Sequence, residues 1–285
     1  MSKTRCFFVS DLHGKIDRYT KLFEATEEER PEVIFLGGDI LPGLRSSGGS
    51  FEDFINDYLL KKLADLRDRL KDAYPRVFLI LGNDDGRHDE QSLITASSAG
   101  LLEYSHNLKK QLGHWTVYGY SYVPPTPFRL KDWERYDVSR YVDPGCISPE
   151  EGTHLFPVSP EELRYSTIQK DLEKLAGKDD LRKAVFLFHS PPYKSKLDRA
   201  ALDGTTIDHV PLDVHVGSIA IQRFIEAGQP HLTLHGHIHE SARITGSWQD
   251  RIGRTVMISA AHDGPELALV RFVIEDPGSA VRELI

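Results

Sequence analysis

The chain has 285 residues, of which 40% are hydrophobic, enough for a sizeable core in one large domain or two small ones. Its formal net charge of −8, without a long basic run, argues against broad binding to nucleic acid or to anionic membranes. The only cysteines, Cys6 and Cys146, cannot form a disulfide framework. Because no leader or membrane-spanning run is visible either, we expect a cytoplasmic protein that does not contact a membrane.

Three apolar runs in the first third of the chain predict buried strands. They lie at residues 6–10, 33–36 and 77–81, and amphipathic periodicity over residues 15–26 and 51–73 predicts helices between them. Strands that alternate with amphipathic helices are typical of βαβ units, so we predict a mainly parallel sheet.

The rest of the chain is less regular. Residues 124–160 are rich in proline, aromatic and charged side chains, which indicates an irregular insertion, either a lid over the site or a surface loop. We therefore predict a single domain over residues 1–285 with an insertion at about 124–160. Further strands are expected at 101–104, 115–122, 184–188, 231–234, 243–248, 255–259 and 267–274, and further helices at 161–176 and 216–227.

Five of the apolar runs end in residues that can coordinate a metal ion. These residues are Asp11 with His13, Asp39, Asn83, His189, and His237 with His239. The carboxyl ends of strands line the ligand crevice of an open α/β sheet, so we expect the five ends to meet at one edge. Alternate residues of an extended segment face the same way, which brings His237 and His239 together, with His235 as well if the turn permits. Taken singly, each residue has an ordinary explanation as a cap, a turn or a buried histidine.

Two carboxylates, four imidazoles and one amide are too many ligands for one tetrahedral ion. They suit two divalent ions that share a bridging carboxylate. Mixed imidazole and carboxylate ligation favours Mn, Fe, Zn or Co over Ca. Two such ions about 3.5–4 Å apart are suited to displacement at phosphorus, which points to a small phosphate ester as substrate.

The order Asp-x-His, Gly-Asp, Gly-Asn, strand-terminal His and Gly-His-x-His, spanning residues 11–239, resembles the calcineurin-like metallophosphoesterase superfamily. The resemblance implies an α/β fold, a four-layer α/β/β/α sandwich, and hydrolysis by a hydroxide that bridges two metal ions. It also implies a ligand set: Asp11, His13 and His239 on one ion, Asn83, His189 and His237 on the other, and Asp39 on both.

Asp84 departs from the family pattern, because many members have histidine directly after the Gly-Asn pair. That histidine assists the leaving group or binds phosphate, whereas a carboxylate acts as a general acid only if burial or Asp85 raises its pKa. Relatives with another residue at this place tend to be phosphodiesterases, so we expect diester rather than monoester cleavage. A plain turn residue is the alternative for Asp84. No tyrosine follows Asp39, which disfavours a ferric-tyrosinate site.

His215 is a second candidate catalytic residue. It stands before a predicted helix whose first backbone amides could hold a phosphate while the imidazole supplies a proton. The alternative is an ordinary helix start with Ser218 as the N-cap.

Other functions fit the pattern less well. A phosphomonoesterase or nucleotide phosphatase of the same superfamily is the nearest alternative, and a low-activity metal-binding scaffold is another, although the chain retains all seven ligands. The acidic charge and the lack of a Lys/Arg stripe make nucleic acid an unlikely substrate. An amidohydrolase usually opens with His-x-His where this chain has Asp-x-His. The oligomeric state stays open.

Overall fold

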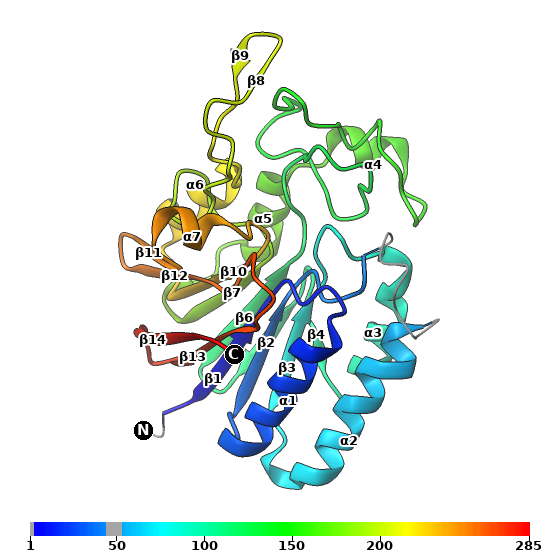
Figure 1. Ribbon diagram of the computed structural model, residues 1–285, viewed down its shortest axis with the longest axis vertical. Coiled ribbons are helices and arrows are strands. Elements are labelled where there is room, and N and C mark those ends of the chain that lie inside the picture. Colours follow the sequence, from blue (N-terminus) through cyan, green and yellow to red (C-terminus); the bar gives the residue numbers. More distant parts are fainter. Residues whose placement is uncertain (1–2, 44–52) are drawn as a thin grey trace.

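The computed structural model describes residues 3–43 and 53–285. Two six-stranded sheets pack face to face, and helices cover the outer surface of each (Figure 1). This is the four-layer α/β/β/α sandwich that the family resemblance implied, and the prediction of the fold class is confirmed.

The first sheet has the strand order β14-β13-β1-β2-β3-β4. Its centre is parallel, whereas β13 runs antiparallel to β1 and places Phe272 opposite Cys6. Helices α1, α2 and α3 lie on its outer face (Figure 1). The bounds are β1 (Arg5–Val9), β2 (Val33–Gly37), β3 (Arg76–Ile80), β4 (Glu103–Tyr104), β13 (Ala268–Val273), β14 (Asp276–Leu284), α1 (Ile16–Glu29), α2 (Leu60–Leu70) and α3 (Glu90–Ser98).

The second sheet has the order β11-β12-β10-β7-β6-β5, again with a parallel centre and antiparallel outer strands. The expectation of a mainly parallel sheet therefore holds only for the middle of two mixed sheets. The bounds are β5 (Lys109–Leu112), β6 (Trp115–Tyr120), β7 (Ala184–Phe188), β10 (Leu232–His235), β11 (Gln249–Ile252), β12 (Thr255–Ser259), α5 (Ile168–Ala176) and α6 (Ile219–Gly228).

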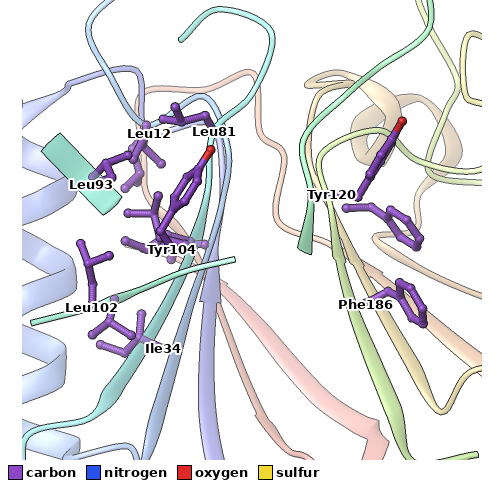
Figure 2. Close-up of a cluster of buried hydrophobic side chains, with 14 of the residues drawn as sticks. Leu12, Ile34, Leu81, Leu93, Leu102, Tyr104, Tyr120 and Phe186 are labelled. Atoms are coloured by element: carbon purple, nitrogen blue, oxygen red, sulfur yellow. The ribbon is translucent and has the colours of Figure 1, made fainter. Parts of the chain in front are cut away.

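The central strands are apolar throughout because both of their faces are buried. Along β2, Ile34 lies in the core beneath the helices, whereas Phe35 lies in the core between the sheets and stacks on Phe78 with ring centroids 5.4 Å apart. Figure 2 shows the helix-facing layers, with Ile34 on the first sheet and Tyr120 and Phe186 on the outer face of the second. These packed faces hold the strand ends, and thus the loops that follow them, in fixed positions.

Two predicted elements differ from the structure. Residues 161–176 form two helices, α4 (Pro160–Tyr165) and α5, because the Thr167 side chain accepts a hydrogen bond from the Lys170 amide and starts a new helix. Residues 243–248 are not a strand: α7 (Ser241–Thr245) ends at Gly246, whose φ of 70° stops the helix, and β11 begins at Gln249.

The helix predicted from residue 51 begins outside the described residues. Its described part is a π-helical turn, η1 (Ile55–Leu59), followed by α2 and a short 3₁₀ turn, η2 (Lys71–Ala73). The remaining short elements are η3 (Arg87–Asp89), η4 (Leu181–Lys183), β8 (Thr206–Ile207) and β9 (Val210–Pro211).

Residues 124–160 contain no named helix or strand before α4 begins at Pro160, and they make only isolated bridges, such as the one between Leu130 and Thr153. In Figure 1 this green segment lies at the same end of the sandwich as the β8–β9 hairpin. The domain boundaries and the lid remain predictions. No helix in the described part of the chain is long and apolar enough to cross a membrane.

Candidate metal centre

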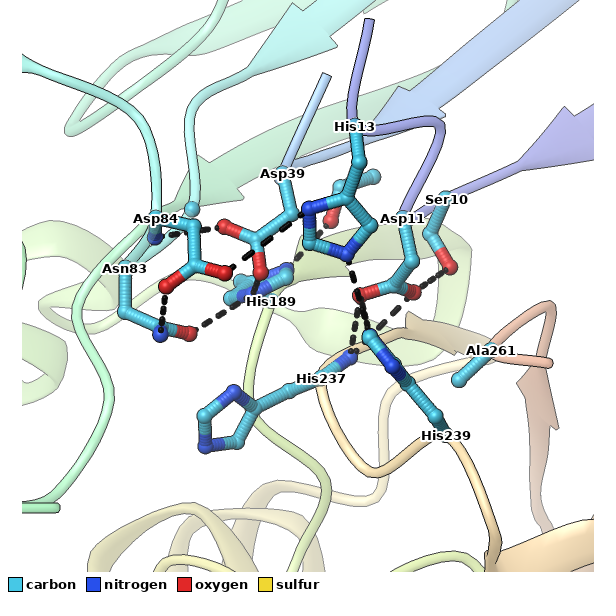
Figure 3. A network of polar contacts seen from close by, with 12 residues as sticks. Ser10, Asp11, His13, Asp39, Asn83, Asp84, His189, His237, His239 and Ala261 are labelled. Atoms are coloured by element: carbon cyan, nitrogen blue, oxygen red, sulfur yellow. Dashed lines mark hydrogen bonds and ion pairs between the residues drawn. The ribbon is translucent and has the colours of Figure 1, made fainter. Parts of the chain in front are cut away.

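The predicted ligands converge at one end of the sandwich (Figure 3). The first sheet delivers Asp11, His13, Asp39 and Asn83, and the second delivers His189, His237 and His239. Hydrogen bonds join the sheets here: among them, His189 Nδ1 lies 2.8 Å from the Gly37 carbonyl, and the His237 amide donates to Asp11 Oδ1 at 3.1 Å. The sequence predicted one sheet edge, and the correction is that two sheets share the site.

Four of these residues have a left-handed backbone. The φ angles are 56° at Asp11, 47° at His13, 50° at Asp39 and 74° at His237. This conformation is uncommon for residues other than glycine and persists when surrounding contacts hold it. Here the Asp11 amide donates to the Gly38 carbonyl at 3.0 Å, and the His13 amide donates to the Asp39 carbonyl at 2.8 Å.

The first cluster consists of Asp11, His13, Asp39 and His239, whose ligand atoms all lie within 4.8 Å of one another. The Nε2 atoms of His13 and His239 are 3.2 Å apart, and His239 Nε2 is 3.2 Å from Asp11 Oδ1. Burial alone would raise the pKa of Asp11, but the hydrogen bond from His239 and the charge of nearby imidazoles hold it far below its usual value. Asp11 therefore presents a charged carboxylate to two imidazoles.

The second cluster consists of Asp39, His189 and His237, again within 4.8 Å. His189 Nε2 lies 3.2 Å from Asp39 Oδ2 and 3.1 Å from Asn83 Oδ1. Burial disfavours a charged His189, but Asp39 and then Asp11 outweigh burial and raise its pKa to about 10. Burial and the charge of His189 lower the pKa of His237 to about 3, so His237 is neutral, the form that binds metals.

The donor chemistry fits two divalent cations. Asp39 is the carboxylate common to both clusters, and each cluster adds imidazole nitrogens. The amide oxygen of Asn83 points at the second cluster. The imidazole nitrogens of His13 and His239, 3.2 Å apart and partly buried beside carboxylates, need a shared cation or proton between them. Mixed nitrogen and oxygen donors of this kind suit Mn, Fe, Zn or Co.

Asp84 lies next to the residues of the two clusters. Its backbone amide donates to Asp39 Oδ1 at 2.8 Å, its Oδ1 accepts from the Asn83 side-chain Nδ2 at 3.2 Å, and its Oδ2 lies 3.7 Å from His13 Nδ1. Burial and the charge of Asp39 raise the pKa of Asp84. The carboxylate therefore lies beside the cluster residues. Its catalytic role remains a prediction.

Asp85 is a supporting residue that sequence reasoning missed. Its fully buried carboxylate accepts hydrogen bonds from the Leu41 amide at 2.8 Å, the Gly82 amide at 2.9 Å and the Ile40 amide at 3.2 Å. It thereby ties the loop after Asp39 to the loop that carries Asn83. Burial and the Asp39 charge raise the pKa of Asp85. In the sequence, Asp85 stands outside the motif and carries no signal of this role.

His235 does not face the clusters. It is the last residue of β10 and is fully buried, with Nδ1 at 2.9 Å from the Ser190 carbonyl and Nε2 at 2.7 Å from the Thr233 hydroxyl. Burial lowers its pKa to about 4, so it is neutral. The strand ends at His235 and the chain turns at His237, so alternation along an extended segment does not apply here, and His237 and His239 belong to different clusters.

His215 lies in the loop before α6, where its Nδ1 is 2.8 Å from the buried carboxylate of Asp198. The first helix amides are already occupied, because those of Ile219 and Ala220 donate to Asp137 at 2.7 and 3.1 Å. Ser218 caps the helix as predicted, accepting from the Ile221 amide. The proposed phosphate site on these amides is therefore wrong, and a catalytic role of His215 stays a prediction.

Two facing mixed sheets with a His/Asp cluster at the shared end of their strands are the architecture of a metal-dependent phosphoesterase. A family model described as calcineurin-like phosphoesterase matches residues 4–241, so the chain belongs to this family. The predicted family is confirmed, and it makes the chain a hydrolase of phosphate esters. Among curated proteins, no sequence matches this chain.

Solved structures resemble the chain over nearly its whole length. The protein TT1561 of Thermus thermophilus is 14% identical, with 99% of each chain covered and a TM-score of 0.55. Phosphopantetheinyl hydrolase (PptH) from Mycobacterium tuberculosis is 12% identical over 91% of this chain and 90% of its own, with a TM-score of 0.51. A dimetal phosphatase from Danio rerio is 11% identical over 95% and 93%, also with a TM-score of 0.51. At these identities the likeness establishes the fold alone.

Proposed function

We propose that the chain hydrolyses phosphodiesters with two divalent ions, Mn, Fe, Zn or Co, held in the two clusters. Such ions would supply a water of lowered pKa and neutralise the phosphoryl oxygens. The assignment of ligands follows the clusters: Asp11, His13 and His239 for one ion, Asn83, His189 and His237 for the other, and Asp39 for both. The support is the convergence of these side chains and the family match.

The preference for diesters rests on Asp84, whose carboxylate lies between Asn83 and His13. A monoester carries up to one more negative charge than a diester. Two like charges about 4 Å apart repel by about 1 kcal/mol in water and about 4 kcal/mol near a protein surface. A carboxylate at this place therefore disfavours a dianionic monoester more than a monoanionic diester.

Replacing Asp84 with His is expected to raise kcat/KM for a monoester about 10–100-fold, because a repulsion worth roughly 1.4–2.8 kcal/mol is removed. The measurement compares 4-nitrophenyl phosphate with bis(4-nitrophenyl) phosphate in the presence of Mn. Asp84→Asn is the matched variant that removes only the charge. It should also gain monoesterase activity; a loss of diesterase activity in Asp84→Asn would instead identify Asp84 as a proton donor.

The same screen decides between the remaining functions. A wild-type chain that prefers the monoester would be a phosphomonoesterase or nucleotide phosphatase and would contradict our proposal. A chain that binds metal and cleaves no ester would be a scaffold. If both variants match wild type on both substrates, Asp84 is only a turn residue.

Metal removal is expected to destabilise the protein. Each ion that binds only the folded chain at about 100 times its Kd adds about 2.7 kcal/mol to the free energy of unfolding, which corresponds to roughly 5–10 °C in Tm per ion. Thermal unfolding after chelation, with Mn, Fe, Zn or Co then added back singly, measures this shift. A Tm that none of the four ions raises would contradict metal binding at the clusters.

A further inference from the structure

A buried arginine connects the loop that carries Asp11 to a loop near the other side of the site. Arg18 lies on α1 and is 3% exposed. Its Nη1 donates to the Asp11 carbonyl at 2.5 Å, its Nη2 to the Gly264 carbonyl at 2.6 Å, and its Nε to the Pro265 carbonyl at 3.4 Å. No carboxylate within residues 3–43 and 53–285 forms an ion pair with it.

Burying Arg18 costs free energy. A guanidinium stays charged when it is buried, and its transfer out of water is unfavourable unless its N–H donors find hydrogen-bond acceptors. Among the described residues, the hydrogen-bond partners of Arg18 are three backbone carbonyls, from two loops that lie far apart in the sequence. The rigid fork of the guanidinium then fixes the position of each carbonyl relative to the other.

Both sides of Asp11 are held in this way. Its amide donates to the Gly38 carbonyl, and its carbonyl accepts from Arg18. Held at both ends, Asp11 keeps its φ of 56°, and its carboxylate stays within 3.2 Å of His239 Nε2. Without Arg18 the Asp11 carbonyl loses this buried donor, and the strained backbone is free to relax and carry the carboxylate away from the cluster.

The other end of the connection lies near His239. Gly264 and Pro265 belong to the loop that follows β12. This loop contacts the segment around His239 on both sides, because the Ala260 amide donates to the His235 carbonyl at 3.1 Å and Asp263 pairs with Arg243 at 2.6 Å. Arg282 holds the same loop from β14, donating to the Ala261 carbonyl at 2.7 Å, but no contact links it to Asp11 within the described residues. Arg18 therefore links two neighbours of the first cluster, whereas Arg282 touches only one.

We propose that Arg18 is a positioning residue for the subsite formed by Asp11, His13 and His239. It aims the Asp11 carboxylate by holding the Asp11 carbonyl against the loop beside His239. The expected effect of Arg18 on metal affinity rests on the proposed function, whereas its effect on the position of the Asp11 loop does not. The second subsite, around His189, receives no contact from Arg18 in the part of the chain that the structure describes.

The test compares Arg18→Met with Arg282→Met, the same loss at a partly buried arginine that anchors the same loop. In the metal-free protein, hydrogen exchange at the Asp11 and His13 amides should quicken in Arg18→Met and stay unchanged in Arg282→Met. When Mn binding is measured by titration calorimetry, one of the two dissociation constants for Mn should rise about 10–100-fold in Arg18→Met. Substitutions of residues that hold a metal ligand in place have effects of this size. Arg18→Lys, which can retain one carbonyl contact, should fall between wild type and Arg18→Met.

Wild-type protection of both amides in Arg18→Met would overturn the inference, as would equal weakening of both ions or the same losses in Arg282→Met. If Arg18→Met does not fold, the same amide exchange is measured in Arg18→Lys, and wild-type protection of both amides there would overturn the inference. A wild-type chain that binds no metal or cleaves no ester would overturn the proposed function instead, because amide exchange in the metal-free protein reports on Arg18 without either.

Discussion

Asp39→Asn is expected to abolish retention of both metal ions and to lower ester hydrolysis about a thousand-fold. Asp39 is the carboxylate that the two clusters share, and its pKa is lowered because His189 outweighs the effect of burial, so it is charged. The amide of asparagine keeps the shape but removes the charge that both cations need. A loss of about 4 kcal/mol of electrostatic stabilisation corresponds to this factor. Metal content after dialysis and kcat/KM on bis(4-nitrophenyl) phosphate measure the two effects.

Asp68→Asn is the matched control, because Asp68 is exposed on α2 and the substitution is the same. It should keep its metal and its activity. Retention of two ions in Asp39→Asn, or more than about a tenth of wild-type activity, would show that Asp39 does not bridge the clusters. An equal loss in Asp68→Asn would show that the loss is unspecific.

Asp85→Ala is expected to lower the free energy of unfolding by about 3–5 kcal/mol, since each buried donor left without its partner costs roughly 1–3 kcal/mol. Three backbone amides, those of Ile40, Leu41 and Gly82, lose their acceptor in this variant. The loops carrying Asp39 and Asn83 lose their connection at the same time. Urea unfolding of the metal-free protein measures the change without any contribution from bound ions.

Asp85→Asn separates shape from hydrogen bonding. Its side chain fills the same space but retains one acceptor oxygen, so we expect a smaller loss than in Asp85→Ala. Asp68→Asn should change stability by no more than about 0.5 kcal/mol. A loss below about 1 kcal/mol in Asp85→Ala would mean that water or a neighbouring group replaces the carboxylate, and that the two loops do not depend on Asp85.

The candidate ligands were predictable because their signal is local. Each apolar strand is buried on both faces and reads as a continuous run, and a polar residue directly after it marks the end of the strand. The shared edge of a parallel arrangement then places Asp11, Asp39 and Asn83 together. The order of the motifs additionally indicates the family and, through it, the sandwich architecture, which the apolar runs alone do not specify.

The supporting residues were not predictable, because their roles depend on contacts between distant segments. Arg18 looks like an ordinary polar residue of an amphipathic helix, yet its partners include Gly264 and Pro265. His235 belongs to the histidine-rich stretch, but its ring contacts the Ser190 carbonyl and does not join either cluster. Likewise, the division of the strands between two sheets depends on which strands pair with one another, and the sequence of a single apolar run does not specify its partner strand.

The pairing of β1 with β13 bears on how the protein is made. Because Cys6 stands opposite Phe272, β1 has one side without a neighbour until the ribosome has synthesised the chain as far as β13. An exposed, apolar edge of this kind invites association with other nascent chains. The first sheet therefore closes late in synthesis, and the interval before closure is the period in which a chaperone that covers β1 would protect the nascent polypeptide from aggregation.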